Sequence, residues 1–97
     1  MIDFSKLDKI IHEKGRLSIM TLLATRQKWV FQELKSQLDM SDGNLITHLR
    51  TLEKTRYVKS QKNPSRRETS YTVTPEGRIA FEAYLGLLEQ IINSSKN

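Results

Sequence analysis

The stretch SDGNLITHLRTLEKTRY, residues 41–57, decides how the chain folds. It opens with Ser41, whose side chain suits the N-cap of a helix, and continues with an acid that suits the positive end of the helix dipole. Leucines then recur at helical spacing, at Leu45, Leu49 and Leu52. Such spacing predicts a helix with one buried face. The face opposite the leucines is short and polar, as in a surface that recognises another molecule.

The segment before this helix completes a helix–turn–helix unit. Residues 31–38, FQELKSQL, carry apolar side chains at helical spacing and predict a short helix. A tight corner between two helices needs a residue near the left-handed region, where Asp or Asn can replace Gly, and Asp39 fits that position. Met40 then supplies an apolar side chain between the two helices, and Ser41 begins the second one.

Two strands joined by a turn are predicted after Arg56. Residues 57–62 and 68–73 are rich in β-branched and aromatic side chains, and residues 63–67, NPSRR, form a turn cluster between them. Every charged side chain from Lys54 to Arg67 is basic. This run is either a solvated loop or a strip that contacts phosphates, and we favour the strip.

Two further helices are predicted at the start of the chain. Residues 3–13 form the first, with an apolar stripe along one side, and Gly15 ends or bends it. Residues 16–25 form the second, which is apolar over most of its circumference and therefore central. A short link or single strand follows at residues 28–30, where Trp29 is expected to pack in the core.

The last helix is apolar over more of its circumference than one small core requires. It spans residues 75–93 and starts with Thr74 as the N-cap and Pro75 at the first helical position. A terminal helix on a small core needs a narrower apolar stripe. This helix is therefore either buried on two sides within its own domain or covered by a partner. We favour a partner, because large exposed apolar patches are rare on monomers.

Composition limits the possible functions. The chain has 97 residues, which corresponds to one small domain, with a net charge of +5 and a pI of about 9.7. It has no cysteine, and its histidines lie far apart without paired carboxylates, so we expect no metal site, no cofactor and no enzymatic activity. No apolar stretch is long enough for a signal peptide or a membrane span, which predicts an intracellular, cytoplasmic protein.

The combined motifs resemble a known family. The SDGNL…HL…LE…Y pattern, with Thr74, Glu76, Gly77 and Arg78 at the start of the last helix, is similar to the small winged-helix transcriptional regulators of the MarR/ArsR-like group. The resemblance covers about residues 5–92. It implies a homodimeric DNA-binding repressor or activator whose first and last helices form the dimer interface. The chain departs from the pattern at two positions often occupied by glycine, Asp39 and Arg56, and it lacks the metal-binding clusters of metal-sensing members.

The sequence therefore predicts a mainly α winged helix-turn-helix (α+β), residues 1–97, in the order helix, helix, short strand, helix, helix, strand, strand, helix. A homodimer would bind double-stranded DNA, with the recognition helix in the major groove and the basic wing on the phosphate backbone or in the minor groove. The expected contacts of the recognition helix are Ser41, Asn44, Thr47, His48, Arg50 and Thr51. Those of the wing are Lys59, Lys62, Arg66 and Arg67. The expected dimer interface comprises Phe4, Leu7, Ile11, Tyr84, Leu88, Ile91 and Ile92.

Two alternatives stay open at this level. His48 either donates to a base or phosphate or is simply solvated. The whole chain is either a DNA-binding regulator or a winged-helix protein–protein interaction module within a larger complex, because winged helices also bind proteins. A small-molecule effector is compatible with the sequence but is not indicated by it.

Overall fold

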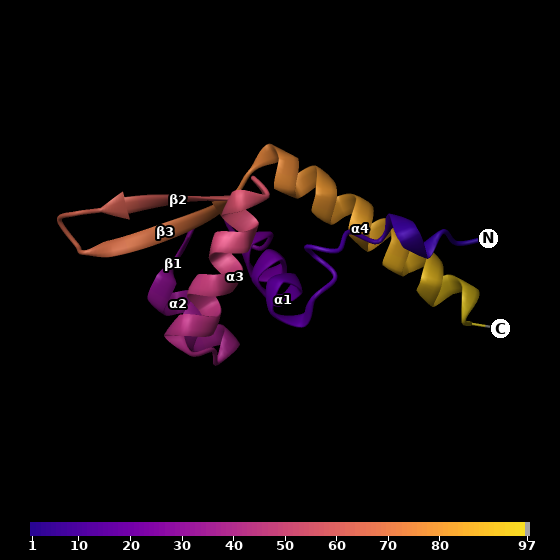
Figure 1. Ribbon diagram of the computed structural model, residues 1–97, viewed down its shortest axis with the longest axis horizontal. Helices are drawn as coiled ribbons and strands as arrows, with labels where there is room; N and C mark the ends of the chain where they lie inside the picture. Colours follow the sequence, from indigo (N-terminus) through magenta and orange to yellow (C-terminus); the bar gives the residue numbers. More distant parts are fainter. Residues whose placement is uncertain (97) are drawn as a thin grey trace.

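Four α-helices and a three-stranded antiparallel sheet make up the computed structural model, which describes residues 1–96 (Figure 1). In chain order the elements are a short 3-10 helix η1 (Phe4–Lys6), α1 (Lys14–Leu23), β1 (Trp29–Val30), α2 (Phe31–Leu38), α3 (Asp42–Lys54), β2 (Val58–Asn63), β3 (Glu68–Val73) and α4 (Pro75–Ser94). The sheet order is β1-β3-β2, so that β2 and β3 form a hairpin and β1 extends it. The predicted winged helix-turn-helix is confirmed.

The helix–turn–helix corner has the predicted geometry. Asp39 ends α2 in the left-handed region, with φ 51° and ψ 48°. The Ser41 side chain caps α3 by accepting a hydrogen bond from the Asn44 amide at 3.2 Å. Arg56, after α3, also has a positive φ of 70°. The two positions where family members often have glycine are therefore the two left-handed ends of the helices in this unit.

The helix predicted over residues 3–13 is wrong. Only η1 is helical there, because Leu7 takes an extended conformation with ψ 122°. The Asp8 carboxylate then accepts hydrogen bonds from the amides of Ile10 and Ile11 at 2.8 and 3.1 Å. A side chain that bonds the backbone in this way stabilises a turn in competition with a helix. The apolar stripe of this segment is real, but it is presented by a turn.

The following helix also begins earlier than predicted. The Glu13 side chain accepts a hydrogen bond from the Arg16 amide at 2.8 Å and so acts as the N-cap of α1. Gly15 consequently lies in the first turn of α1, where it is buried, and does not end a preceding helix. The helix ends at Leu23, two residues before the predicted end at Thr25.

A single apolar core joins α1, α2, α3, the sheet and the first half of α4. Its buried side chains come from every one of these elements and from Ile11 in the N-terminal turn: Ile11, Ile19, Met20, Leu23, Trp29, Leu34, Leu45, Leu49, Leu52, Val58, Tyr71, Val73, Phe81 and Tyr84. The three leucines of α3 all belong to it, as their spacing predicts. Trp29 is a core residue, and the Arg26 guanidinium stacks over its ring at 3.6 Å.

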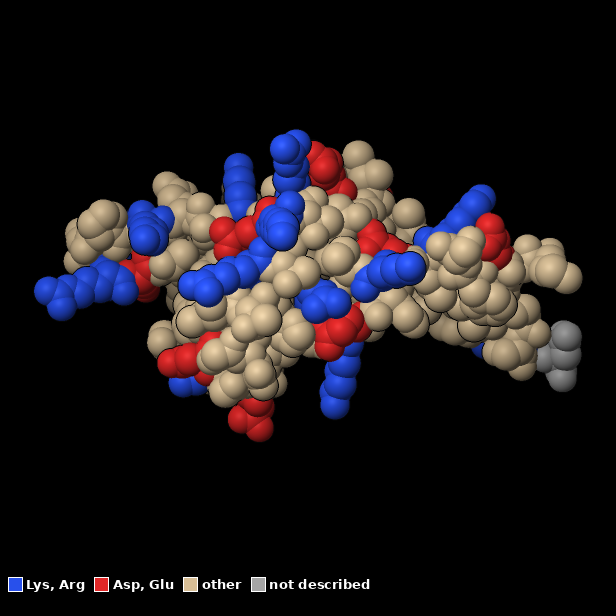
Figure 2. All heavy atoms as spheres, viewed as in Figure 1, with Lys and Arg blue, Asp and Glu red and all other residues tan. Residues whose placement is uncertain are grey.

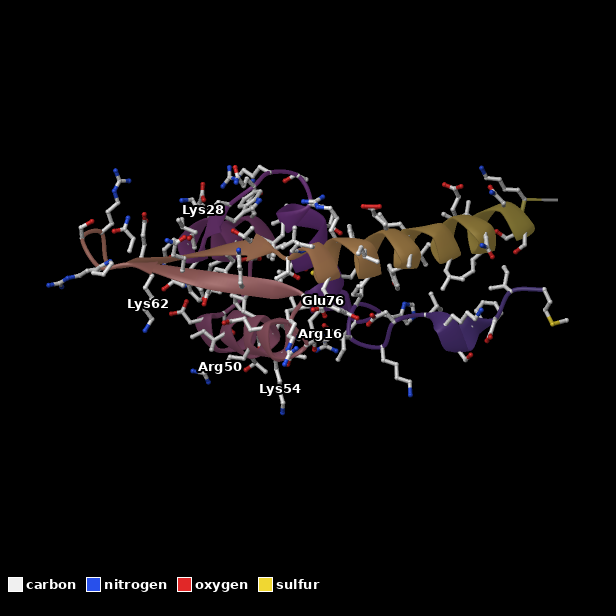
Figure 3. All side chains as sticks on the ribbon, turned by 90° about the horizontal axis from the view of Figure 1, so that it is seen from above. Arg16, Lys28, Arg50, Lys54, Lys62 and Glu76 are labelled. Atoms are coloured by element: carbon white, nitrogen blue, oxygen red, sulfur yellow. The ribbon has the colours of Figure 1, made fainter. Side chains whose placement is uncertain are left out.

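The molecule is elongated, with extents of 54 × 25 × 21 Å. Figure 1 shows the hairpin at one end of the long axis and both chain termini at the other. The N-terminal segment lies beside the second half of α4 in Figures 1 and 3. We call this thin end, residues 1–7 and 85–94, the arm. Between the hairpin and the arm lies the body that carries α1, α2 and α3.

Replacing Gly77 or Gly86 of α4 by alanine should have opposite effects on the stability of the protein. A Cβ at Gly77 would overlap the backbone carbonyl oxygen of Tyr57, whereas a Cβ at Gly86 would meet nothing within 4 Å. We expect Gly77→Ala to lower the free energy of unfolding by about 2 kcal/mol or more, because backbone cannot yield as a side chain does. Gly86→Ala should raise it by about 0.5–1 kcal/mol, since glycine disfavours a helix interior. Urea unfolding of both variants tests this pair, and a neutral Gly77→Ala would contradict the close packing.

The environment of the Tyr57 hydroxyl leads us to expect a loss of stability at alkaline pH. Burial, together with the hydrogen bond from its hydroxyl to Asp8 and the negative charges of Asp8 and Glu76, raises the pKa of Tyr57 to about 12 from its ordinary value of 10.0. Between these two values the unfolded chain releases the proton first, so the stabilisation is complete below pH 10 and is lost towards pH 12. We therefore expect the difference in unfolding free energy between the wild type and Tyr57→Phe to shrink over this range. A difference that stays constant in denaturant titrations would refute this role of Tyr57.

Candidate nucleic-acid interface

The polar face of α3 is open to solvent over its first two turns. Ser41, Asn44, Thr47 and Arg50 are exposed, and Thr51 is half-buried. The Thr47 hydroxyl donates to the Gly43 carbonyl at 2.8 Å. The Thr51 hydroxyl likewise donates to the Thr47 carbonyl at 3.1 Å. These hydroxyl oxygens keep their capacity to accept hydrogen bonds.

His48 does not lie on this open face. Its side chain is 22% exposed, and its Nδ1 atom lies 3.4 Å from Arg16 Nη1 and 3.6 Å from Glu13 Oε1. A Cβ at Gly15 would come within 2.5 Å of its Nε2 atom. The ring therefore packs on the start of α1. Neither of the two roles that the sequence left open for His48 describes this position.

The hairpin divides its lysines between two faces. Lys59 and Lys62 are three residues apart on β2, and side chains alternate along a strand, so the two point to opposite faces. Ser60, on the same face as Lys62, donates a hydrogen bond to Glu53 of α3 at 3.1 Å. The face of Lys62 is thus the one that faces α3, and Lys59 lies on the outer face of the wing. Lys59 and Lys62 do not belong to one continuous strip, contrary to the prediction.

Three basic side chains from two elements point to the same side of the molecule. Figure 3 shows this arrangement for Arg50 and Lys54 of α3 and Lys62 of β2, while Lys28 points the other way. All three are exposed. Lys54 begins the basic run that the sequence predicts to contact phosphates, although it is not among the individual contacts expected of the recognition helix or the wing. The helical spacing of four residues from Arg50 to Lys54 is the signal that places them together.

The hairpin tip carries two more basic side chains. Arg66 and Arg67 are exposed in the turn between β2 and β3, and Arg67 has a positive φ of 51°. Figure 2 shows basic side chains at the hairpin end and across the body on the face that carries α3. The acid at the start of α3 is partly neutralised, because Asp42 pairs with Lys35 at 2.9 Å. We call Arg50, Lys54, Lys62, Arg66 and Arg67 the basic face.

Two of the predicted dimer-interface residues lie in the chain's own core. Ile11 and Tyr84 are fully buried, and the Tyr84 hydroxyl is hydrogen-bonded to His12 Nδ1 at 2.7 Å. Neither can meet a partner while this packing persists, because both are covered by the N-terminal turn or by α4. The sequence pattern could not separate them from truly exposed apolar positions, since both kinds occupy the wide apolar arc of these segments.

The remaining apolar positions of the arm are partly or largely open. Leu7, Leu88 and Ile91 are half-buried, and Phe4 is exposed. Ile92 is 52% exposed and Leu85, which the prediction omitted, is 44% exposed. Leu85 and Ile92 are seven residues apart, which places them on one side of the helix. The arm therefore keeps an apolar surface that its own chain does not cover.

Residues 1–96 contain neither a cluster of metal ligands nor a membrane-spanning helix. No group of His, Asp and Glu side chains in this part of the chain is arranged to hold a metal ion. None of its helices combines the length and the apolar character that a membrane crossing requires. The features that stand out are thus the polar face of α3, the basic face and the arm.

Comparisons with known proteins agree with the winged-helix fold. Residues 16–92 match the family described as winged helix DNA-binding domain. The chain is 35% identical over 91 residues to an uncharacterized protein of Methanocaldococcus jannaschii, MJ0432, covering 92% of this chain and 96% of the relative. It is 29% identical to a transcriptional regulator homologue protein from Pyrococcus horikoshii OT3, with a TM-score of 0.90 and coverage of 96% and 95%. MarR shares the fold at 18% identity and a TM-score of 0.78, over 89% of this chain and 64% of MarR.

Proposed function

Because the chain belongs to the family of winged helix DNA-binding domains, we propose that it is a sequence-specific transcriptional regulator that binds double-stranded DNA as a homodimer. The observation that carries this proposal is the common direction of Arg50, Lys54 and Lys62 beside the open polar face of α3. A duplex offers bases to read and phosphates on either side of them. This surface offers short hydrogen-bonding side chains flanked by cations.

The recognition helix of this proposal is α3. The major groove is about 12 Å wide and admits one α-helix. Asn44 and Thr47, exposed in the first two turns of α3, are the side chains assigned to base edges. Ser41 holds the start of the helix and Thr51 lies at the border of the face. His48 is not assigned to DNA, because it packs on α1.

The basic face is assigned to the DNA backbone. Arg50, Lys54 and Lys62 would neutralise phosphates beside the recognition helix, while Arg66 and Arg67 at the hairpin tip would reach the backbone or the minor groove further along. Lys59 is left out of this set, since it lies on the outer face of the wing. Its position makes it a natural control for the residues of the basic face.

The arm is assigned to the dimer. Phe4, Leu85 and Ile92 offer exposed apolar surface, and the half-buried Leu88 and Ile91 would be covered with them. Burying this surface against a second copy is favourable in proportion to the apolar area removed from water. The two recognition helices would then read half-sites about 34 Å apart, one duplex turn, on a pseudo-palindromic sequence. Such a regulator acts on DNA inside the cell, which places it in the cytoplasm.

Selection of bound sequences from a random duplex pool tests the proposal. We expect enrichment of a pseudo-palindrome with half-sites one turn apart, and a complex whose mass corresponds to two protein chains per duplex. Sizing of the free protein should show a dimer. A monomer that ignores duplex DNA at low salt would contradict the proposal and would favour a protein-interaction module instead.

A further inference from the structure

The five residues His12–Arg16, which run from the end of the N-terminal turn into the first turn of α1, contact both α3 and α4. At their first end, His12 Nδ1 is hydrogen-bonded to the Tyr84 hydroxyl at 2.7 Å, and the two rings lie 5.7 Å apart at an angle of 50°. Tyr84 is fully buried in α4. This contact therefore joins the segment to the middle of α4, directly before the arm begins.

The other end of the segment meets α3 at His48. Arg16 Nε donates to the Ile10 carbonyl at 2.6 Å, which fixes the guanidinium, and its Nη1 lies 3.4 Å from His48 Nδ1. The other ring nitrogen of His48, Nε2, faces Gly15, where a Cβ would come within 2.5 Å.

Glu13 completes this end. It accepts the Arg16 amide at 2.8 Å, and its Oε1 lies 3.7 Å from Arg16 Nη1 and 3.6 Å from His48. Burial raises the pKa of Glu13, but the hydrogen bonds from the Arg16 and Gly15 amides, with the nearby His48 ring and Arg16 guanidinium, outweigh burial and lower the pKa overall. The carboxylate is thus charged at neutral pH and holds the start of α1, Arg16 and the His48 ring in one cluster.

We propose that His12–Arg16 is a brace that fixes α3 relative to α4, with His48 and Tyr84 as its positioning residues. The inference rests on the proposed homodimer. If the arm joins two copies, the angle between α4 and α3 sets the distance between the two recognition helices. In an elongated molecule a small rotation at the arm moves the far helix considerably. A contact that ties α3 and α4 to the same five residues holds that angle, and so the match to the half-site spacing.

The distance between the two recognition helices can be measured directly. The chain has no cysteine, and Gly43 in α3 is exposed with nothing within 4 Å of a Cβ. Gly43→Cys therefore carries one spin label per chain and two per dimer. Pulsed dipolar spectroscopy should give a narrow distance distribution in the parent protein without DNA. Tyr84→Phe, which keeps the ring but removes the hydroxyl, should broaden or shift it.

Gly15→Ala is the second variant that tests the brace. The new methyl group should displace the His48 ring and change the distance. His48→Ala, which removes the contact with α3 without adding volume at Gly15, should change it as well, and circular dichroism should show that both variants keep their helices. Tyr57→Phe is the matched control, since it removes a tyrosine hydroxyl bond to Asp8 outside the brace and should leave the distribution unchanged.

Affinities of the same variants, without the label, complete the experiment. On the pseudo-palindrome selected from the pool, Tyr84→Phe should bind about tenfold more weakly (1.4 kcal/mol), while its affinity for an isolated half-site stays that of the parent. An unchanged distance distribution in Tyr84→Phe and in Gly15→Ala overturns the brace. Absence of any dipolar signal overturns the homodimer instead. The brace is then tested within one chain, between labels at Gly43→Cys and Glu82→Cys, where the same shifts are expected and their absence overturns it.

Discussion

Alanine at both Arg50 and Lys62 is expected to weaken binding to duplex DNA of any sequence by about 30-fold near physiological salt. Each phosphate contact adds roughly 0.9 to the slope of log affinity against log salt, so a dimer that loses two contacts in each chain should have a slope smaller by about 4. Both side chains are exposed on the same side of the molecule and neither belongs to the core. The loss should therefore appear in binding and not in folding. Titration of labelled duplexes at several salt concentrations measures both quantities.

Lys59→Ala is the control for this prediction. It removes the same charge from the same strand as Lys62→Ala, but from the face of the hairpin that points away from α3. We expect its salt slope to match that of the wild type. Equal effects of Lys59→Ala and Lys62→Ala would mean that net charge, and not the basic face, governs binding, and would remove the geometric argument for the wing.

Local signals explain why most of the fold is predictable from the sequence. The N-caps Ser41 and Thr74 define the starts of α3 and α4, and both bonds are present in the structure. The left-handed Asp39 defines the corner in the same way. Each of these signals acts within a few residues, so no knowledge of the tertiary fold is needed. The predicted winged-helix family is confirmed by the family match, and the fold is shared with MarR.

The errors concern residues whose role depends on distant contacts. The spacing of His48 on α3 is compatible with a reading face, but its ring meets Gly15, far away in the sequence. Tyr84 belongs to the apolar positions of α4 by its helical spacing, but its hydroxyl is hydrogen-bonded to His12 in the N-terminal turn. In the predicted first helix, the Asp8 carboxylate replaces helical hydrogen bonds by a turn. Periodicity shows which side chains are apolar, but not which neighbour covers them.

The same limit applies to the candidate site. Asn44 and Thr47 are exposed as predicted, because they lie opposite the leucine stripe of their own helix. The division of the hairpin lysines depends instead on which face of the wing packs on α3. Strand alternation predicts that Lys59 and Lys62 point apart, but only the contact between Ser60 and Glu53 shows which of them faces α3. The match to a DNA-binding family agrees with the prediction that the chain is not an enzyme.

The second prediction with a large expected effect concerns the role of the arm in dimer formation. Leu85→Asp combined with Ile92→Asp should convert the dimer into a monomer, because each change places a charge in apolar surface that the proposed partner buries. Both side chains are outside the chain's own core, at 44% and 52% exposure, so the monomer should remain folded. Sedimentation gives the assembly state, and circular dichroism checks that the helices persist.

Ile79→Asp controls for the charge itself. Ile79 is 71% exposed, more than either arm residue, and lies about 130° around α4 from Leu85 and Ile92. The Ile79→Asp protein should stay dimeric and should bind the selected pseudo-palindrome like the wild type. A monomeric Ile79→Asp protein beside a dimeric double variant would place the dimer contact on the opposite side of α4 and would overturn the assignment of the arm.

On the pseudo-palindrome, loss of the dimer should cost more affinity than loss of the Arg50 and Lys62 side chains. In a dimer the second recognition helix binds at an effective concentration set by the connection to the first, which raises affinity by about 10²–10⁴ over one half. The double variant should therefore lose at least about 100-fold on the pseudo-palindrome and little on an isolated half-site. Comparing the loss of affinity for the pseudo-palindrome with the loss for the half-site distinguishes a lost dimer from a damaged recognition helix. Damage to α3 would weaken binding to both duplexes equally. A double variant that is monomeric yet binds the pseudo-palindrome unchanged would show that each chain reads DNA independently.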